Sequence, residues 1–282
     1  DEVYNAEWST EYTLEKAFDE YLKAWIILHI LEACMTGKVP EEPSFLFNMS
    51  VGYDLKGIKE ERMQVFIDNM IECHKDSFGD YIAQAAAMLE DNIFEGTGWE
   101  GSALKAASSL DRISRSIASS VTISTMHGCP PDEIEAICSY IIQEKHIDTF
   151  VKLNPTLLGY DKVRSILDSY GYSNVGLRRE SFDHDLQKSD AFPMLERLEK
   201  LAKENGVGFG VKLTNTLASI SDGKVLPGNE KYMSGKALFP VSLEVARQIA
   251  EHFDGRMPIS FSGGVSILNA GMLFDAGVHP IT

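Results

Sequence analysis

The arrangement of apolar and polar residues differs on the two sides of residue 118. Beyond this point, short runs rich in β-branched residues alternate with segments in which apolar residues recur every three or four positions. The runs predict strands at 120–125, 149–153, 173–177, 207–213, 258–261 and 278–282. Strands that alternate with helices form parallel sheets, and near-continuous apolar strands indicate that both faces of the sheet are covered.

The periodic segments between these strands predict helices. The clearest covers 131–145, where Ile134, Ile137 and Ile141 share one face and prolines suit the first turn. The same spacing predicts further helices at 162–170, 191–205, 241–253 and 266–276. Alternation of this kind is compatible with an open or a closed parallel sheet.

The first 118 residues carry a different pattern. It predicts a strand at 44–51 and helices at 14–35, 60–71 and 80–94, the first of them apolar on most sides. We expect residues 55–118 to form a helical insertion that follows a barrel strand.

Together these elements give seven strands, for which an eight-stranded barrel is the nearest closed arrangement. The predicted fold class is α/β, a (β/α)8 TIM barrel, with residues 1–282 as a single barrel-like domain. The chain begins with no strand and stops inside one. We therefore expect a barrel that is incomplete at its N-terminus, in a chain that is a fragment of a longer polypeptide.

Composition narrows the function classes. A formal charge of −16 and a pI of about 4.8 disfavour binding to nucleic acid or to anionic lipid. No apolar run is long enough to cross a bilayer. The four cysteines are scattered and form no CxxC pair, which fits a reducing cytoplasm and predicts neither a disulfide framework nor an iron–sulfur cluster. We expect a cytoplasmic protein that acts on a small molecule.

Polar residues cluster where the predicted strands end, which in a barrel is the catalytic face. Lys152 and Lys212 lie inside apolar strands, where an ammonium group must find a partner or lose its proton. Either lysine could hold an anionic flavin ring, form a Schiff base, pair with a carboxylate, or extend to solvent. Both are candidate catalytic residues.

Two asparagines follow at strand ends. A primary amide both donates and accepts, which suits the pyrimidine edge of a flavin or a heterocyclic substrate. Asn154 precedes Pro155, so it could instead form a turn. Asn215 lies between two threonines and is the stronger candidate.

His127 and Cys129 precede a predicted helix. They could supply an acid/base group and a thiol whose pKa the helix N-terminus would lower, or they could only form the loop that leads into the helix. Two such groups without a third at useful spacing predict no metal site. The sequence contains no GxGxxG motif, so it predicts no Rossmann-type dinucleotide site.

Gly263 and Gly264 lie between a predicted strand and a predicted helix. Backbone N–H groups at such a position can point at a phosphate, because no Cβ blocks its approach. Loops after strands seven and eight of a β/α barrel commonly hold a phosphate. Alternatively, the two glycines only form a tight turn.

Four segments resemble the FMN-binding barrel of dihydroorotate and dihydropyrimidine dehydrogenases: Ser234-Gly-Lys-Ala-Leu-Phe-Pro240, Ile259-Ser-Phe-Ser-Gly-Gly264, Phe274-Asp-Ala-Gly277 and Thr214-Asn-Thr216. The resemblance implies that FMN is bound. Its phosphate would lie at Ser234, Gly235, Gly263 and Gly264, and its ring near Asn154, Thr214, Asn215 and a lysine.

A closer resemblance covers nearly the whole chain. It is carried by Asn5–Thr10, Phe47–Asp54, Ser124–Pro131, Lys152–Tyr160 and Gly210–Thr216, which are similar to YgfK-type selenate reductase subunits. The resemblance implies a multidomain oxidoreductase with redox partner subunits. Its FAD, NAD(P) and iron–sulfur sites would lie in a later region that is absent from this chain.

The dehydrogenase pattern does not select one lysine. In that family the flavin-contacting lysine lies in the strand before the Thr-Asn-Thr turn. The predicted strands place Lys152 two strands before the turn and Lys212 in the same strand as the turn. The catalytic cysteine of the dehydrogenases follows an Asn-x-Ser motif, whereas Cys129 lies in His-Gly-Cys-Pro-Pro.

The leading hypothesis is a flavin-dependent oxidoreductase barrel that passes electrons between FMN and a small heterocycle or oxyanion. One alternative is a flavin-free barrel that acts as a scaffold or docking domain in a redox complex. The other is a Schiff-base lyase that uses Lys152 or Lys212, with the two glycines holding a substrate phosphate.

Overall fold

The computed structural model describes residues 4–5, 13–124, 127–221 and 228–281. They form two compact units, one made of residues 1–8, 50–58 and 121–282 and the other of residues 9–49 and 59–120. The first is an α/β unit that contains all of the predicted site residues. The second is mainly helical.

A five-stranded sheet runs through the α/β fold in the order β2-β3-β4-β5-β8. Its strands are β2 (Asn48–Val51), β3 (Ser120–Ser124), β4 (Asp148–Leu153), β5 (Phe209–Leu213) and β8 (Ile259–Phe261). Strand β5 pairs in parallel with β4 and with β8, and a parallel bridge joins Phe261 to Ile281. The prediction of a parallel α/β sheet is confirmed. Thr125 and Thr282, which end two of the predicted strands, lie outside the described residues.

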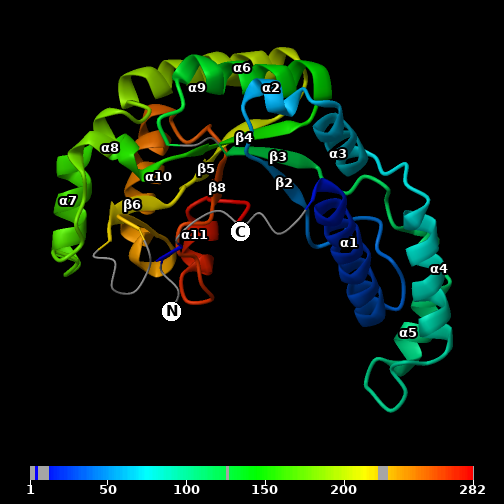
Figure 1. The fold of residues 1–282 in the computed structure, drawn as a ribbon. Helices are drawn as coiled ribbons and strands as arrows, with labels where there is room; N and C mark the ends of the chain where they lie inside the picture. Colours follow the sequence, from blue (N-terminus) through cyan, green and yellow to red (C-terminus); the bar gives the residue numbers. More distant parts are fainter. Residues whose placement is uncertain (1–3, 6–12, 125–126, 222–227, 282) are drawn as a thin grey trace. The chain divides into compact units, whose positions relative to one another are not determined.

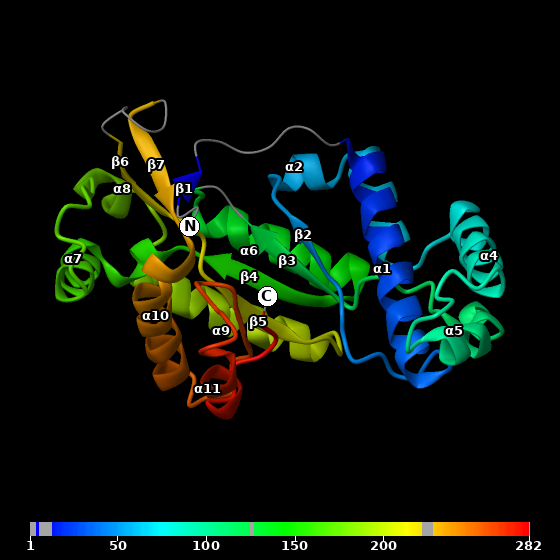
Figure 2. The same ribbon diagram turned by 90° about the horizontal axis from the view of Figure 1, so that it is seen from below.

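The helices that follow the predicted periodicity are α6 (Pro131–Tyr140), α7 (Tyr160–Ser169), α9 (Lys188–Glu204), α10 (Phe239–His252) and α11 (Ala270–Asp275). Two short helices of this unit, α2 (Leu55–Ile58) and α8 (Arg179–Asp183), were not predicted. A π turn at Ile141–Lys145 continues α6 to the predicted end. Helices α6 and α9 lie side by side over one face of β4 and β5 (Figure 1), and the opposite face of these strands is seen in Figure 2.

The predicted strand at 173–177 is wrong. This segment contains no strand, and its Val175 and Leu177 are buried in the same core cluster as Leu167 and Phe182. Arg164 holds the loop by donating to the carbonyl oxygen of Val175 at 2.6 Å. The apolar residues therefore anchor a loop rather than form a strand. As a result, β4 is followed directly by β5 in the sheet.

A second, antiparallel sheet was not predicted. It has the order β1-β7-β6, formed by β1 (Tyr4–Asn5), β6 (Leu217–Ile220) and β7 (Glu230–Met233). Leu217 and Met233 are fully buried and belong to the core cluster that also contains Val175. The 3-10 turn η4 (Gly235–Ala237) then leads into α10.

The helical unit is built around α1 (Leu14–Thr36). It also contains α3 (Glu61–Ile71), α4 (Ser77–Glu90), α5 (Glu100–Ala107) and the 3-10 turn η1 (Leu110–Arg112). Leu22 and Trp25 of α1 are buried, and the indole N–H of Trp25 donates to the carbonyl oxygen of Ser114 at 2.9 Å. Residues 59–120 pack with residues 9–49 in this unit. The description of residues 55–118 as an insertion in a barrel stays a prediction.

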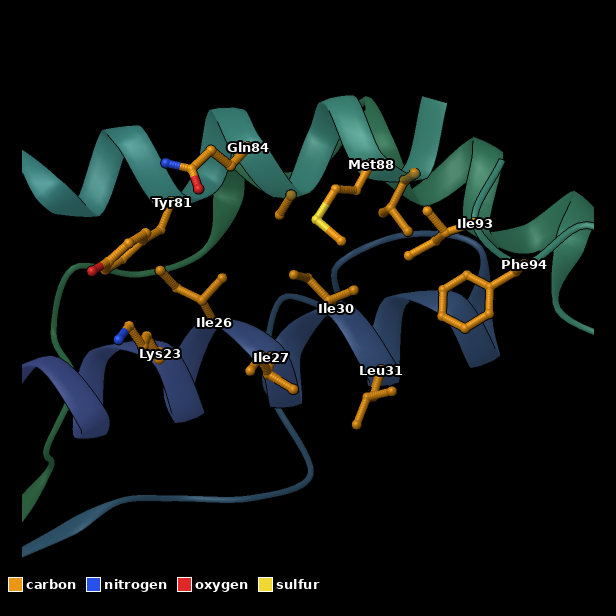
Figure 3. A pocket seen from close by; sticks show the side chains of 12 residues that line it. Lys23, Ile26, Ile27, Ile30, Leu31, Tyr81, Gln84, Met88, Ile93 and Phe94 are labelled. Carbon is orange, nitrogen blue, oxygen red and sulfur yellow. The ribbon is translucent and has the colours of Figure 1, made fainter. Parts of the chain in front are cut away.

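An apolar pocket of about 410 Å³ opens on the helical unit. Figure 3 shows Ile26 and Ile30 of α1 pointing toward α4, which carries Met88, with Lys23 and Tyr81 at one end. None of the predicted site residues lines it. Within the described residues, no helix has both the length and the apolar character needed to cross a membrane.

Candidate active site

A buried carboxylate, Asp185, lies at the centre of the polar residues at the strand ends. Its side chain is 2% exposed and follows α8. His127 Nδ1 and the Gly128 N–H each lie 3.0 Å from its oxygens. Asn154 Nδ2 donates to it at 2.9 Å and Thr156 Oγ1 at 2.5 Å. One carboxylate therefore connects the loop after β3 to the end of β4.

Asp185 is ionised at neutral pH. Burial alone would raise its pKa, but hydrogen bonds from His127, Thr156 and the Gly128 N–H outweigh burial and lower the pKa to about 2. An ionised carboxylate only accepts hydrogen bonds, so neutral His127 carries its proton on Nδ1. The other ring nitrogen, Nε2, is then an acceptor.

His127 borders a cavity at the carboxyl ends of β2 and β3. The imidazole stacks on Tyr232 of β7, with ring centroids 6.3 Å apart and an angle of 18° between the rings. The cavity measures about 510 Å³ and is lined by Gly52, Tyr53, Asp54, His127, Gly128, Cys129, Pro130, Glu133 and Ile137. A histidine held by a buried carboxylate and bordering a cavity has the arrangement of a general acid or base.

Cys129 lines the same cavity but is not an activated thiol. Burial raises its pKa, and the carboxylates of Glu133 and Asp185 raise it further. Glu133 is fixed close by, because it accepts the N–H of Leu55 at 2.9 Å. The expected lowering of this pKa by the helix N-terminus is therefore wrong, since nearby negative charge and burial dominate.

Cys129 should therefore react slowly with electrophiles. At pH 7.5 we expect iodoacetamide to alkylate it at least about threefold more slowly than an unstructured cysteine peptide, because less thiolate is present. The rate should still rise above pH 9.0, the ordinary value for this group. Mass spectrometry of the modified peptide measures the rate at this position alone. A rate faster than that of the peptide would contradict the raised pKa.

Asn154 and Asn215 form a chain of amides that begins at Asp185. Asn154 donates to the carboxylate through Nδ2, so its Oδ1 faces the other way and accepts from Asn215 Nδ2 at 2.8 Å. Both amides are buried. Because Asp185 only accepts, it fixes the orientation of both side chains. Asn154 therefore positions Asn215 rather than presenting its own amide to a ligand.

Lys152 and Lys212 are direct neighbours. In the parallel pairing of β4 with β5, Lys152 lies opposite Lys212. Burial lowers the pKa of each lysine, and the charge of Lys212 lowers the pKa of Lys152 further. No carboxylate pairs with either ammonium group within the part of the chain that the structure describes.

The predicted phosphate segments also meet. Thr214 Oγ1 lies 2.7 Å from Ser242 Oγ of α10, and a Cβ on Gly263 would collide with the same Ser242 side chain. A Cβ on Gly264 would lie 2.5 Å from the carbonyl oxygen of Gly235. The glycines thus allow the loop after β8 to pack on the turn before α10.

The N–H groups of the two glycines already have partners. Gly263 donates to the carbonyl oxygen of Leu213 at 3.2 Å, and Gly264 donates to that of Ser262 at 2.9 Å. This geometry supports the tight-turn interpretation of the glycine pair. A phosphate bound here would rely on the backbone of the turn Gly235–Ala237, which follows Ser234, more than on Gly263 and Gly264.

The whole chain, residues 1–282, matches the family described as "Oxidoreductase YgfK, N-terminal TIM-barrel domain". The chain belongs to this family. Two curated proteins named "Putative oxidoreductase YgfK", from Escherichia coli K12 and from Escherichia coli O157:H7, are each 54% identical to it over 286 residues. The match covers 100% of this chain and 27% of each relative. The chain therefore spans about a quarter of the length of these relatives.

Family membership confirms the resemblance to YgfK-type proteins and the TIM-barrel class of the fold. A solved structure, DHODH in complex with ferulenol from Eimeria tenella, is similar over 71% of this chain and 57% of that chain. It has 16% sequence identity and a TM-score of 0.30, which is too low to support an argument about this site.

The structure brings several predicted site residues of this YgfK-family domain into two groups. In one, Asp185 joins His127, Asn154 and Asn215. The other surrounds Ser242 and contains Thr214, Gly235, Gly263 and Gly264. The groups meet at the end of β5, because Thr214 and Asn215 are consecutive.

Asp185 and Ser242 were missed by sequence reasoning. Asp185 lies in a polar stretch, His184-Asp-Leu-Gln187, that carries no signal of burial. Ser242 lies next to Val241 and three residues before Val245, on the face of the helix that the apolar pattern predicts to be buried. A polar residue on that face could have indicated a site. Among the described residues, no three His, Cys, Asp or Glu side chains gather in a group suited to a metal.

Proposed function

We propose that this chain is the FMN-binding barrel of a multidomain oxidoreductase, and that it passes electrons between the flavin and a small heterocycle or oxyanion. The observation that carries the proposal is the pairing of β4 with β5. It places Lys152 in β4, the strand immediately before β5, and β5 is the strand that ends in the Thr214-Asn215 turn, so the position of Lys152 fits the dehydrogenase pattern. The fold class and the description of the YgfK family as an oxidoreductase support the same conclusion.

The residues at the strand ends suit a flavin ring. The pyrimidine edge of the ring needs a cationic donor and an amide with fixed orientation, and Lys152 and Asn215 supply these groups. The bound flavin would supply the hydride and electron chemistry. Lys152 would stabilise negative charge at this edge, and Asn215 would orient the ligand.

His127 is the group that would move a proton. Asp185 keeps the proton on Nδ1, so Nε2 can accept a proton from a small molecule in the adjacent cavity and return it. The high pKa of Cys129 disfavours a thiolate and leaves it able to donate a proton. We assign the principal acid/base role to His127.

The remainder of the full-length protein belongs to the same proposal. By its resemblance to YgfK-type selenate reductase subunits and to dihydropyrimidine dehydrogenase, it would carry FAD, NAD(P) and iron–sulfur clusters outside this chain. It would act in the cytoplasm with redox partner subunits.

The proposal is tested by the flavin content of the purified full-length protein. We expect one FMN per chain, distinguished from FAD by chromatography before and after phosphodiesterase digestion. Lys152→Met should weaken FMN binding about tenfold or more, because it removes a charge-assisted hydrogen bond. Lys200→Met, which removes an 80% exposed lysine from α9, is the matched control and should bind FMN normally.

A flavin-free scaffold is the second candidate. It is favoured by the backbone hydrogen bonds of Gly263 and Gly264, which leave these N–H groups engaged within the protein. Under this alternative, the full-length protein would contain no FMN even after reconstitution. The same measurement therefore decides between the two functions.

A further inference from the structure

Lys152 and Lys212 belong to a polar row that crosses three strands. The register of β4, β5 and β8 aligns Lys152 with Lys212 and Lys212 with Ser260. Residues aligned in a parallel sheet point to the same face, and neighbouring strands are about 4.8 Å apart. The three side chains therefore lie next to one another.

This row lies on the face opposite to α6 and α9. Side chains alternate between faces along a strand, so Val151, Leu153, Val211 and Leu213 occupy the other face, where all four are almost completely buried. Burial of this kind is expected of the face that α6 and α9 cover (Figure 2). The lysines are only partly buried, which leaves them accessible to a ligand.

One end of the row is closed by an aromatic ring. Phe150 precedes Lys152 by two residues on the same face, and its ring lies over Gly210, where an added Cβ would meet it at 2.7 Å. At the opposite end lie Asn154 and Thr214, each two residues beyond a lysine. A ligand on the row therefore meets an aromatic ring on one side and polar residues on the other.

Among the residues that the structure describes, no carboxylate pairs with the two lysines of the row. Two ammonium groups on adjacent strands repel each other, and partial burial disfavours both charges. The buried carboxylate of the site, Asp185, is already bound by donors that include His127, Asn154 and Thr156. The proposed flavin would use one of these charges, that of Lys152, and an ammonium group has three donors, so Lys152 could donate to the flavin and to a second ligand. The charge of Lys212 would remain for that second ligand.

We propose that Lys152, Lys212 and Ser260 bind the oxygen atoms of a small anion, a carboxylate or an inorganic oxoanion, as a ligand distinct from the flavin. Two point charges and a hydroxyl group match the several acceptor oxygens of such an anion. The binding site stands whether or not FMN is present. Its role as the substrate site rests on the proposed function and narrows the substrate to an anionic molecule.

Calorimetric titration of the full-length protein with sodium sulfate and with sodium acetate, at constant ionic strength, tests the proposal. We expect at least one of the two anions to bind. Lys212→Met should weaken that binding about tenfold or more, since it removes a charge-assisted hydrogen bond and keeps the aliphatic stem. Lys212→Arg should stay within about threefold of the wild type, because the charge is retained.

Two further variants complete the test. Lys200→Met loses the same charge from an exposed position and should bind the anion as the wild type does. Ser260→Ala keeps both lysines and should weaken binding about threefold or more, which provides a test even if Lys212→Met fails to fold.

The contradicting outcomes are distinct from failure of the flavin proposal. Absence of sulfate and acetate binding to the wild type would overturn the anion site. Unchanged anion affinity in Lys212→Met, with loss of FMN instead, would overturn it as well and assign Lys212 to the flavin. Absence of FMN together with anion binding that depends on Lys212 would refute the flavin proposal alone.

Discussion

Replacing Asp185 with Asn is expected to destabilise the α/β unit by roughly 3 kcal/mol, because a buried acceptor of several hydrogen bonds becomes partly a donor. His127, Gly128 and Thr156 all direct donors at this carboxylate. An amide can accept only through one atom, so at least one of these donors would lose its partner. Hydrogen exchange of the peptides that cover β4 and β5 measures the loss where it occurs.

The same variant has a predicted pH signature. The folded-state pKa of Asp185 is lowered from 3.8 to about 2, so this group stabilises the fold above pH 3.8. The contribution, about 2 kcal/mol, is lost as the pH falls from about 4 toward 2. The wild type should lose this stability in that range, whereas Asp185→Asn should not lose it because the group is absent.

Asp161→Asn is the matched control for Asp185→Asn. The Asp161 side chain is 85% exposed and pairs with Arg179 at the surface. Its replacement should change stability by no more than about 0.5 kcal/mol. Equal effects of the two substitutions would show that the hydrogen bonds of Asp185 do not support the fold. Loss of turnover in Asp185→Asn with a normal FMN content would indicate that its main role is to position His127.

Periodicity predicted most helices of the α/β unit because most of them bury one face. The pattern at 131–145 is an example, since Ile134, Ile137 and Ile141 are all buried in the structure. Local pattern also found the strands that carry Lys152 and Lys212. The rule that polar residues at the ends of parallel strands gather at one edge of the sheet was sufficient to predict that Asn154, Asn215 and His127 lie close together.

Periodicity failed where tertiary contacts decide the backbone. Val175 and Leu177 are apolar because they enter a core cluster, and Arg164 holds their loop from α7. The false strand placed Lys152 two strands before the Thr-Asn-Thr turn, which left the choice between the lysines open. Because this strand does not exist, β4 is followed by β5, and Lys152 is the lysine that fits the dehydrogenase pattern.

The missed residues depend on partners that are distant in the sequence. Asp185 becomes a buried anion only because His127 and Asn154 reach it from 58 and 31 residues away. The strands β6 and β7 are short, and three of the four residues in β7 are only partly buried, so their pattern resembles a loop. The burial of Asp185 and the pairing of β6 with β7 therefore become visible only in the folded structure.

Gly264→Ala is expected to separate the loop after β8 from the turn before α10. Gly264 has φ = +83°, a conformation that costs an alanine about 1 kcal/mol or more. The added Cβ would also lie 2.5 Å from the oxygen and 2.9 Å from the carbon of the Gly235 carbonyl. These are backbone atoms that no side-chain rotation can move. We expect a stability loss of roughly 3 kcal/mol and, if FMN is bound there, at least about tenfold weaker FMN binding.

The control for this substitution is Gly271→Ala in α11. Apart from its chain neighbours and the backbone of the helix itself, no atom lies within 4 Å of the position that an added Cβ would take there, and alanine favours a helix by up to about 1 kcal/mol over glycine. Gly271→Ala should therefore leave stability unchanged or raise it.

Differential scanning calorimetry and flavin content, measured on both variants, separate two roles of Gly264. A destabilised Gly264→Ala protein that keeps its FMN affinity would assign the glycine to packing alone. Loss of both stability and FMN affinity would place the phosphate at the junction of Gly264 with Gly235. An unchanged melting temperature would contradict the close contact of the two loops, from which both roles follow.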